Sequence, residues 1–367
     1  MFRGIKSVTI RLLLTANVVA IIAMLAVGYS DRLQPTLHPT LSVSGLLFPG
    51  FIVLNLLFFP LWVFIKPKNV LVPLFGFIIS YVPVRTYCPV NMPEDPPEGA
   101  LKILSYNTWS FHEERDADGN VVASAADYIV ECNADIACLQ EAWMGNIRTK
   151  TIADHYPYVK SCVIDNANSI MVASRYPIVK VERIFYESQI NGSAAFFLDI
   201  EGDTVVVVNT HFESNVFSLE DRQQISDFVN GRLKKGDVEA DTRNLLEKLT
   251  RAARIRAPQA DSVARYIEDH DQYPIILCGD FNTWPNSYTH HRLASLLTDC
   301  YVATGLGPGW TFNRNHIDVR IDNIMCSRHW EPFACRVDDD IVASDHFPIT
   351  CWLKKKRKEQ KNAHFSP

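Results

Sequence analysis

The sequence predicts a layered α/β domain that follows a helical membrane anchor. Apolar residues are concentrated before residue 90, in uncharged runs of about the length that a helix needs to cross a bilayer. From Leu101 onward, short β-rich runs alternate with helical stretches, which is the pattern of a layered domain built on central sheets. Uninterrupted apolar runs such as Val205–Val208 indicate strands that are covered on both faces.

The overall composition excludes some classes of protein. The chain has 367 residues, a formal net charge of −5 and a pI near 6.1, which does not suit a protein that coats nucleic acid. Nine cysteines are scattered without any Cys-x-x-Cys pair, so a disulfide framework is not expected. Several of them lie within apolar runs, where cysteine acts as a small core residue. This pattern favours a reducing compartment or a core that shields its thiols.

Residues 1–90 are predicted to form the membrane anchor, with two or three helices. Its apolar runs cover residues 12–29, 43–65 and 70–84. The alternative for the first run is a cleaved signal peptide, since Arg3, Lys6 and Arg11 would supply its basic flank. A retained anchor is preferred, because no clear small-x-small cleavage site precedes a soluble region and a second apolar run follows immediately.

Basic residues predict the orientation of the anchor, because cytoplasmic loops are enriched in lysine and arginine. The basic residues before the first run, together with Lys66 and Lys68 after the second, are placed on the cytoplasmic side. If residues 70–84 cross the bilayer, the following domain is extracytoplasmic; if they lie in the interface, it is cytoplasmic. The third run has no charge, which favours three spans and an extracytoplasmic domain.

Composition also predicts the remaining boundaries. Residues 91–100 hold three prolines and three acidic residues, so they are expected to form a short stiff linker. The α/β domain covers residues 101–353, and residues 354–367 form a basic tail that is expected to be disordered. A polar insertion with helical character occupies residues 213–262, and its long helix is expected to break at Pro258.

The insertion carries a basic stripe. Its members are Arg243, Lys248, Arg251, Arg254 and Arg256. We interpret the stripe as a solvated helix face rather than as a surface that recognises phosphate or lipid headgroups.

Polar residues at the ends of apolar strand-like runs are the candidate site residues. They are Asn107, Glu141, His211, Asp280, Asn282, Asp345 and His346. Ligand sites gather at strand ends in α/β sheets, so these side chains are expected to lie together. Carboxylate and amide oxygens suit Mg²⁺, and histidines can move protons or donate to phosphate oxygens. Each residue alone also has an ordinary structural explanation, such as an Asx turn at Asp280.

Seven short motifs make the chain resemble the endonuclease/exonuclease/phosphatase superfamily, which includes deoxyribonuclease I. In the family's order they are SYNTW (105–109), LQEAW (139–143), SRYPI (174–178), NTHF (209–212), CGDFNTWP (278–285), RIDNIM (320–325) and SDHFPI (344–349). Each motif alone is a weak signal, and together they span most of residues 101–353. The resemblance implies a four-layer α/β/β/α sandwich that hydrolyses phosphate esters at one rim of its two sheets.

The resemblance also implies a metal site. Glu141 matches the family's principal metal-binding glutamate, with Asn107 beside it, and Asp345 matches a second carboxylate near the metal. The implied cofactor is Mg²⁺, with Mn²⁺ as a substitute.

The remaining matched residues are implied to act on the phosphate. Asp280 matches the aspartate that orients or activates the attacking water, and Asn282 matches the asparagine that contacts the phosphate. His346 matches the histidine that is paired with an aspartate, here Asp322, which would favour its charged form. His211 matches the other histidine that faces the phosphate.

Position 168 departs from the family pattern. In deoxyribonuclease I the partner of the second histidine is a glutamate, whereas this chain has Asn168. An amide is expected to orient His211 without a negative charge. His211 should then be less basic and act as a phosphate donor rather than as a strong general acid.

The sequence therefore predicts a membrane-anchored, Mg²⁺-dependent phosphodiesterase in which water attacks phosphorus in line with the leaving group. The phosphoester substrate is left open between nucleic acid and a phospholipid headgroup, because the fold serves both. The alternatives are a phosphomonoesterase that acts on a small or inositol phosphate, and a membrane binding module without activity. The lipid bilayer is the expected partner of the N-terminal helices.

Overall fold

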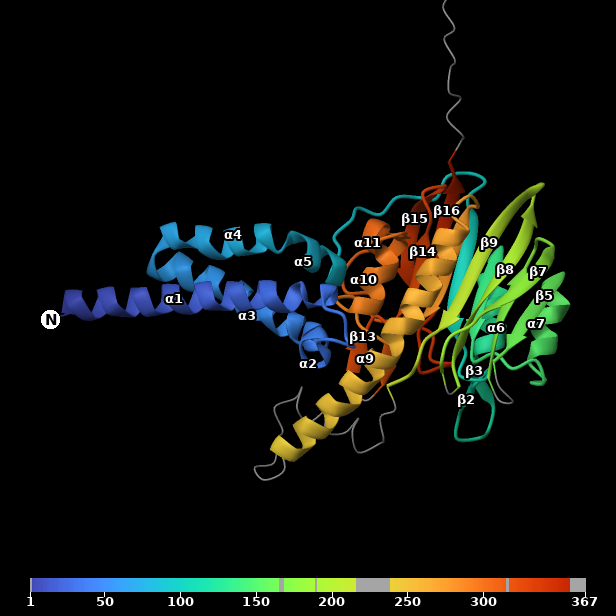
Figure 1. The fold of residues 1–367 in the computed structure, drawn as a ribbon, viewed down its shortest axis with the longest axis horizontal. Helices are drawn as coiled ribbons and strands as arrows, with labels where there is room; N and C mark the ends of the chain where they lie inside the picture. The colour runs from blue at the N-terminus through green and yellow to red at the C-terminus, as the bar shows by residue number, and fades with distance from the viewer. Residues whose placement is uncertain (1, 165–167, 189, 216–237, 315–316, 357–367) are drawn as a thin grey trace, which may run out of the picture.

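The computed structural model describes residues 2–164, 168–188, 190–215, 238–314 and 317–356. An elongated helical unit at the N-terminus projects from one side of an α/β body (Figure 1). Most of the expected basic tail lies outside the described residues. The same holds for residues 216–237 of the expected insertion.

The N-terminal helical unit covers residues 2–87. Its elements are α1 (Phe2–Gly28), the 3-10 helix η1 (Ser30–Arg32), α2 (Pro39–Ser42), the 3-10 helix η2 (Ser44–Leu47), α3 (Phe48–Ile65), the 3-10 helix η3 (Pro67–Val70), α4 (Leu71–Ile79) and α5 (Tyr81–Tyr87). Two helical stretches, Ser7–Arg32 and Pro39–Ile65, are long and apolar enough to cross a membrane. Helices α4 and α5 would add a third span if this pair, which is bent by 69°, crosses as one.

The N-terminal unit buries polar side chains and exposes apolar ones. Asn17 and Asn55 are fully buried, and Trp62 Nε1 donates a hydrogen bond to Asn17 Oδ1 at 2.9 Å. By contrast, Phe64 and Phe75 are 87% and 61% exposed. Such a distribution is unfavourable in water and suits a lipid environment, where polar side chains join helices to one another. The surface of the unit is therefore compatible with contact with lipid.

Two six-stranded sheets form the centre of the body. The first has the order β15 (Trp330–Val337), β16 (Ile349–Lys355), β1 (Leu101–Asn107), β4 (Ile136–Gln140), β6 (Ser169–Ser174) and β5 (Tyr158–Val163). The second has the order β11 (Thr298–Asp299), β14 (Asp322–Cys326), β10 (Ile275–Asp280), β9 (Asp203–His211), β8 (Gly192–Ile200) and β7 (Ile178–Ile184). Strand β1 is parallel to β4, and β9 is parallel to β10. In each pair the carboxyl ends therefore meet at the same edge of the sheet.

The smaller elements lie around these sheets. They are the strand pairs β2 (Glu113–Arg115) with β3 (Val121–Ser124) and β12 (Phe312–Arg314) with β13 (Ile317–Val319), and the helix α11 (Cys300–Thr304).

Helices cover the outer faces of the two sheets, which gives four layers. The covering helices are α6 (Ala125–Cys132) and α7 (Thr149–His155) on the first sheet, and α9 (Val238–Asp269) and α10 (Tyr288–Ala294) on the second. Helices α6 and α7 bury Ile129 and Ile152 against the first sheet, and helices α9 and α10 bury Val263 and Leu293 against the second. A separate apolar core fills the space between the two sheets and contains six buried free cysteines. The predicted α/β/β/α sandwich is confirmed.

Helix α9 contradicts the expected break at Pro258. It continues as one helix through this proline, whose side chain is exposed. The neighbouring Ala257 and Ala260 are fully buried against the body. Burial of this apolar face outweighs the one backbone hydrogen bond that proline cannot donate.

Candidate active site

The two sheets bring the predicted polar residues together at one rim. Asn107 ends β1 and Glu141 directly follows β4 in the first sheet, while His211 and Asp280 end β9 and β10 in the second. Asn107 Nδ2 lies 3.2 Å from both Glu141 Oε1 and Asp280 Oδ2. A single amide therefore connects the carboxylates of the two sheets.

The backbone at this rim adopts conformations that few residues tolerate. Glu141 and Asn282 have positive φ angles of 51° and 52°, and such strain is often retained where it aims a functional side chain. Gly279 has a φ of 148°, and a Cβ atom there would lie 1.9 Å from the carbonyl oxygen of Thr210. Only glycine allows β9 and β10 to approach this closely, which places His211 beside Asp280 in register.

Asp280 is the centre of the site. Its carboxylate is 1% exposed and accepts hydrogen bonds from the backbone N–H of Asn282 at 2.8 Å and from Asn282 Nδ2 at 3.2 Å. Burial, helped by the charge of Asp322, raises the pKa of Asp280 to about 6, against the opposing charges of His346 and His211. The group is thus ionised at neutral pH and still basic enough to accept a proton.

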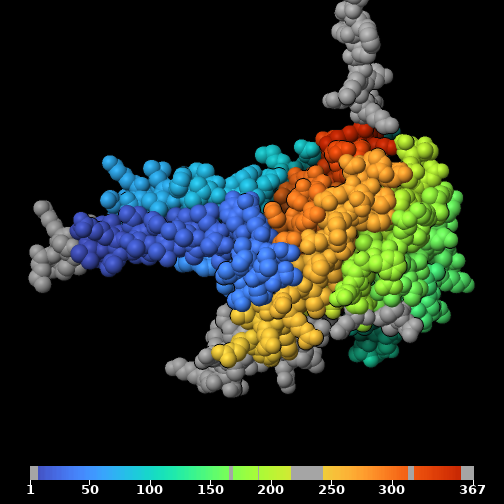
Figure 2. Space-filling view, in the orientation of Figure 1, coloured from blue at the N-terminus to red at the C-terminus, as the bar shows by residue number. Residues whose placement is uncertain are grey.

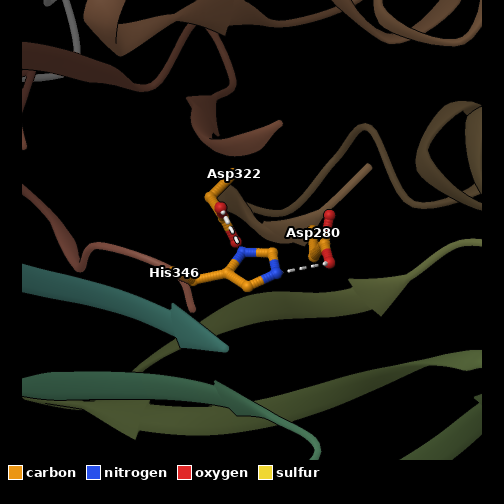
Figure 3. Close-up of side chains that lie close together, drawn as sticks. All are labelled: Asp280, Asp322 and His346. Carbon is orange, nitrogen blue, oxygen red and sulfur yellow. Dashed lines mark hydrogen bonds and ion pairs between the residues drawn. The ribbon is translucent and has the colours of Figure 1, made fainter. Parts of the chain in front are cut away.

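His346 and Asp322 form a buried pair next to Asp280 (Figure 3). His346 Nδ1 lies 2.8 Å from Asp322 Oδ2, and its Nε2 points to Asp280 Oδ2 at 3.8 Å. Burial alone would lower the pKa of His346, but the charges of Asp322 and Asp280 raise it to about 10. The imidazole therefore carries a positive charge at neutral pH and can donate from Nε2.

His211 differs from His346 in its surroundings. Burial lowers the pKa of His211 below its ordinary value, against the charge of Asp280. Its Nε2 lies 3.5 Å from Asp280 Oδ2 and 3.8 Å from Glu141 Oε1. Neither ring nitrogen has a hydrogen-bond partner among the described residues. His211 is thus neutral at pH 7.

The expected bond from Asn168 to His211 is absent from the described part of the chain. Asn168 Nδ2 donates instead to the carbonyl oxygen of Ile190 at 3.1 Å and approaches Asn191 Oδ1 at 3.4 Å. An asparagine is one methylene shorter than the glutamate of deoxyribonuclease I, which limits its reach. The link to His211 is indirect, because Asn191 Nδ2 donates to the carbonyl oxygen of Phe212 at 2.7 Å.

The donor set at this rim fits a divalent cation. Carboxylate oxygens of Asp280 and Asp322 lie within 4.8 Å of each other beside the charged His346, and the second oxygen of Asp322 is buried without a hydrogen-bond partner among the described residues. Burial raises the pKa of Glu141 against the hydrogen bond from Asn107, and the charge of Asp345 adds to the rise. Carboxylates held this close repel one another, which a bound cation would relieve. Glu141 is more accessible than Asp280 and Asp322, with 31% of its side chain exposed.

Two supporting residues lie beneath the rim that the strand-end pattern did not single out. Gln140 Nε2 donates to Asn209 Oδ1 at 2.7 Å, and Asn209 Nδ2 donates to the carbonyl oxygens of Leu139 and Met171. This buried pair joins the two sheets directly below the site. Both residues lie within the motifs LQEAW and NTHF, which was the available signal.

Arg256 also supports the site, although we expected it on a solvated face. Its side chain is 1% exposed, and Nη1 donates to Glu213 O at 2.8 Å and to Asn215 Oδ1 at 2.9 Å. Asn215 Nδ2 in turn donates to the carbonyl oxygen of Asn282 at 2.8 Å. Its helical spacing from the buried Ala252 and Ala260 places Arg256 on the inner face of α9.

Comparison with known families agrees with this geometry. A sequence model of the endonuclease/exonuclease/phosphatase family matches residues 104–346. The chain belongs to this family. It is a hydrolase that acts on phosphate ester bonds, and the family generally uses divalent metals. A second model, for a domain of unknown function, matches residues 10–87. No curated protein matches the chain.

A comparison with solved structures found matches to the greater part of this family member. A functionally unknown conserved protein from Enterococcus faecalis V583 is 14% identical, with a TM-score of 0.48 over 70% of this chain and 100% of that one. Truncated TDP2 from Caenorhabditis elegans is 14% identical, with a TM-score of 0.47 over 71% and 99% of the two chains. The catalytic domain of human Nocturnin is 16% identical, with a TM-score of 0.47 over 73% and 96%.

Proposed function

We propose that the chain is an integral membrane phosphodiesterase that depends on Mg²⁺, with Mn²⁺ as a substitute, and hydrolyses nucleic acid or a phospholipid headgroup. The observation that carries this proposal is the convergence of Asn107, Glu141, His211 and His346 around the buried Asp280. A cation held by Glu141 and its neighbours would supply charge neutralisation at the phosphate.

The negative charge of Asp280 and the positive charge of His346 suggest a separate role for each residue in the reaction. Asp280, ionised at neutral pH, orients the attacking water and accepts its proton. His346, positively charged and fixed by Asp322, donates to a phosphate oxygen and stabilises the charge that develops there. His211, kept neutral by burial, and the amide of Asn282 contact the remaining phosphate oxygens. Positioning and charge stabilisation supply most of the acceleration in such transfers.

A substrate panel tests the proposed function. The purified full chain is incubated with DNA, RNA, sphingomyelin, phosphoinositides and a chromogenic phosphodiester, each with Mg²⁺, with Mn²⁺ and with EDTA. We expect hydrolysis of at least one diester with either cation and background rates in EDTA. Glu141→Gln should raise the Mg²⁺ concentration that gives half the maximal rate, because one carboxylate ligand is lost. Hydrolysis that is equally fast in EDTA, or of monoesters alone, would contradict the proposal.

The arrangement of the N-terminal unit supports an extracytoplasmic body. The end of α1 at Gly28 contacts Asn286 of the body, so the loop after the first span lies on the body's side of the membrane. The N-terminus and the turn between α3 and α4, which holds Lys66 and Lys68, lie at the opposite end of the unit (Figure 1). Because basic residues favour the cytoplasmic side, we propose that the body lies on the other side. The buried cysteines are shielded from oxidation there.

Protease accessibility tests this orientation. We expect protease added to intact cells or spheroplasts to cleave the body, and an epitope tag placed before Arg3 to stay protected until the membrane is opened. A body that is protected in intact spheroplasts and cleaved only after lysis would place it in the cytoplasm.

A further inference from the structure

The N-terminal unit is joined to the body through the ends of its helices. Asn286 Nδ2 lies 3.2 Å from the carbonyl oxygen of Pro83 and 3.4 Å from that of Gly28. Arg320 Nη2 donates to the carbonyl oxygen of Thr86 at 2.5 Å. Gly28 and Thr86 lie in the last turns of α1 and α5, where helix carbonyls lack partners within the helix. The body therefore completes the hydrogen bonding of two helices of the N-terminal unit.

The two body residues in these contacts continue directly into the site. Asn286 lies in the loop that follows Asn282, and Arg320 precedes Asp322 at the start of β14. Both side chains are buried, at 0% and 1% exposure. Arg320 also donates to the carbonyl oxygen of Pro308 at 2.8 Å, so its guanidinium is fixed on the side of the body as well. Each residue thus connects a helix end to one part of the catalytic centre.

The N-terminal unit and the body are tightly packed where they meet. A Cβ atom added to Gly45, in η2, would lie 2.1 Å from the carbonyl oxygen of Asn286 and 2.8 Å from Trp284 Nε1. Trp284 packs with Val43 of the N-terminal unit and with Leu249 of α9. In the space-filling view the N-terminal unit abuts the body directly (Figure 2). A shift of η2 must therefore move the loop that carries Asn282.

We propose that the N-terminal helical unit holds the second-sheet half of the catalytic centre in place, with Asn286 and Arg320 as the positioning residues. The Asp280–Asn282 loop and Asp322 are each attached to an end of a helix in this unit. Turnover consequently depends on the contact between these helix ends and the body. The inference rests on the proposed function for its main readout, which is the rate of hydrolysis.

A substitution within the N-terminal unit alone tests this coupling. The full chain in lipid nanodiscs carries Gly45→Ala, which pushes on the backbone at Asn286, or the control Gly76→Ala. In the control the atoms nearest to the added methyl belong to the side chain of Ile21, inside the same unit, the closest at 2.7 Å. We expect Gly45→Ala to lower kcat by roughly 10- to 100-fold with little change in KM, since small misplacements of catalytic groups are costly. The control should keep its kcat. Equal kcat values for the two variants would overturn the proposal.

A second pair of variants separates positioning from simple loss of stability. Asn286→Ala removes two interface hydrogen bonds next to the site. Asn91→Ala removes two comparable bonds, from its Nδ2 to the carbonyl oxygens of Val302 at 3.1 Å and Gly305 at 2.7 Å, and a third that its Oδ1 accepts from Arg85 Nη2 at 3.1 Å. None of these bonds involves a site residue. We expect similar decreases in unfolding temperature and a fall in kcat for Asn286→Ala alone. Parallel losses of kcat would mean that the contact is only structural.

Amide exchange provides a readout that does not require turnover. Gly45→Ala should speed deuterium uptake in the segment 279–284, and Gly76→Ala should not. If the wild-type chain hydrolyses nothing in the panel, the proposed function fails, while faster uptake in this segment still supports positioning. Unchanged uptake in Gly45→Ala overturns the positioning whatever the activity.

Discussion

Replacing Asp280 with asparagine is expected to lower kcat by roughly 10²- to 10⁴-fold, the usual contribution of a positioned acid or base. The carboxylate accepts from Asn107 Nδ2 and from the amide and backbone of Asn282, and it faces both histidines of the site. An asparagine of the same shape cannot accept a proton from water. It also places an NH₂ group opposite one of the donors that the carboxylate now satisfies.

The pH dependence of the rate tests whether Asp280 is the base. Its pKa of about 6 means that the carboxyl group becomes protonated, and the wild-type rate falls, as the pH decreases through 6. Asp280→Asn should lose this acidic limb, because no proton can bind there. Measuring kcat from pH 5 to 9 for both proteins checks the assignment. A limb near 6 that persists in the variant would assign it to another group.

The folding stability should move in the opposite sense to the rate. A carboxyl group whose pKa is raised by the fold stabilises the fold below its ordinary pKa, and this contribution disappears as the pH rises through about 6. The buried charge of Asp280 therefore lowers the free energy of unfolding at pH 8, and a neutral asparagine removes this cost. The asparagine also leaves one buried donor without its acceptor, which offsets this gain. We therefore expect the variant to unfold at pH 8 at a temperature close to that of the wild type, which thermal unfolding followed by circular dichroism measures. If the variant is unfolded, its loss of kcat does not support the role of Asp280 as the base.

Much of the candidate site could be predicted because the ends of strands can be located from hydrophobic runs in the sequence. Val205–Val208 are fully buried, as their continuous apolar character indicated, and the run ends at His211. The parallel pairing of such strands brings their carboxyl ends to one edge of a sheet. Residues that follow long apolar runs, such as Glu141 and Asp280, were therefore found at the right edge without knowledge of the tertiary structure.

Side-chain partners could not be predicted in the same way. The sequence pattern indicates that Asn168 stands where deoxyribonuclease I has a glutamate. It does not indicate that the shorter Asn168 side chain donates to the carbonyl oxygen of Ile190 rather than to His211. The spacing of Arg256 is compatible both with the basic stripe and with the buried face of α9. Only the packing of α9 on the loop at Glu213 determines that its side chain is buried. Asn286 gives no local signal, because its partners lie in helices far away in the sequence. Such contacts depend on reach and on distant backbone, which periodicity does not report.

Replacing Asp322 with asparagine is the second change with a large expected effect. Asp322 holds the proton on His346 Nδ1 across 2.8 Å and is the strongest of the charges that raise the pKa of this histidine to about 10. Without that charge, burial lowers the pKa and the ring becomes neutral closer to pH 7. The loss of a charged donor to the phosphate should lower kcat at pH 7.5 by roughly 10²- to 10³-fold.

A matched buried pair separates this effect from a general loss of stability. Asp299 Oδ2 accepts from His290 Nε2 at 2.8 Å, both residues are buried, and neither belongs to the site. Asp299→Asn should cost stability, as Asp322→Asn does, but it should leave kcat close to that of the wild type. If both variants lose turnover to the same extent, the effect of Asp322 is not catalytic.

The pH profile and a double-mutant cycle decide whether Asp322 acts through His346. A histidine whose pKa is raised by the fold keeps its charge, and its contribution to stability, until the pH rises through about 10. The wild-type rate should therefore show a basic limb near pH 10, and Asp322→Asn should move this limb toward neutral pH. Because the two residues act as one unit, the double variant Asp322→Asn with His346→Ala should be no slower than His346→Ala alone. Independent, multiplying losses would mean that Asp322 serves the site by another route, such as direct metal binding through its second oxygen, which has no hydrogen-bond partner in the described part of the chain.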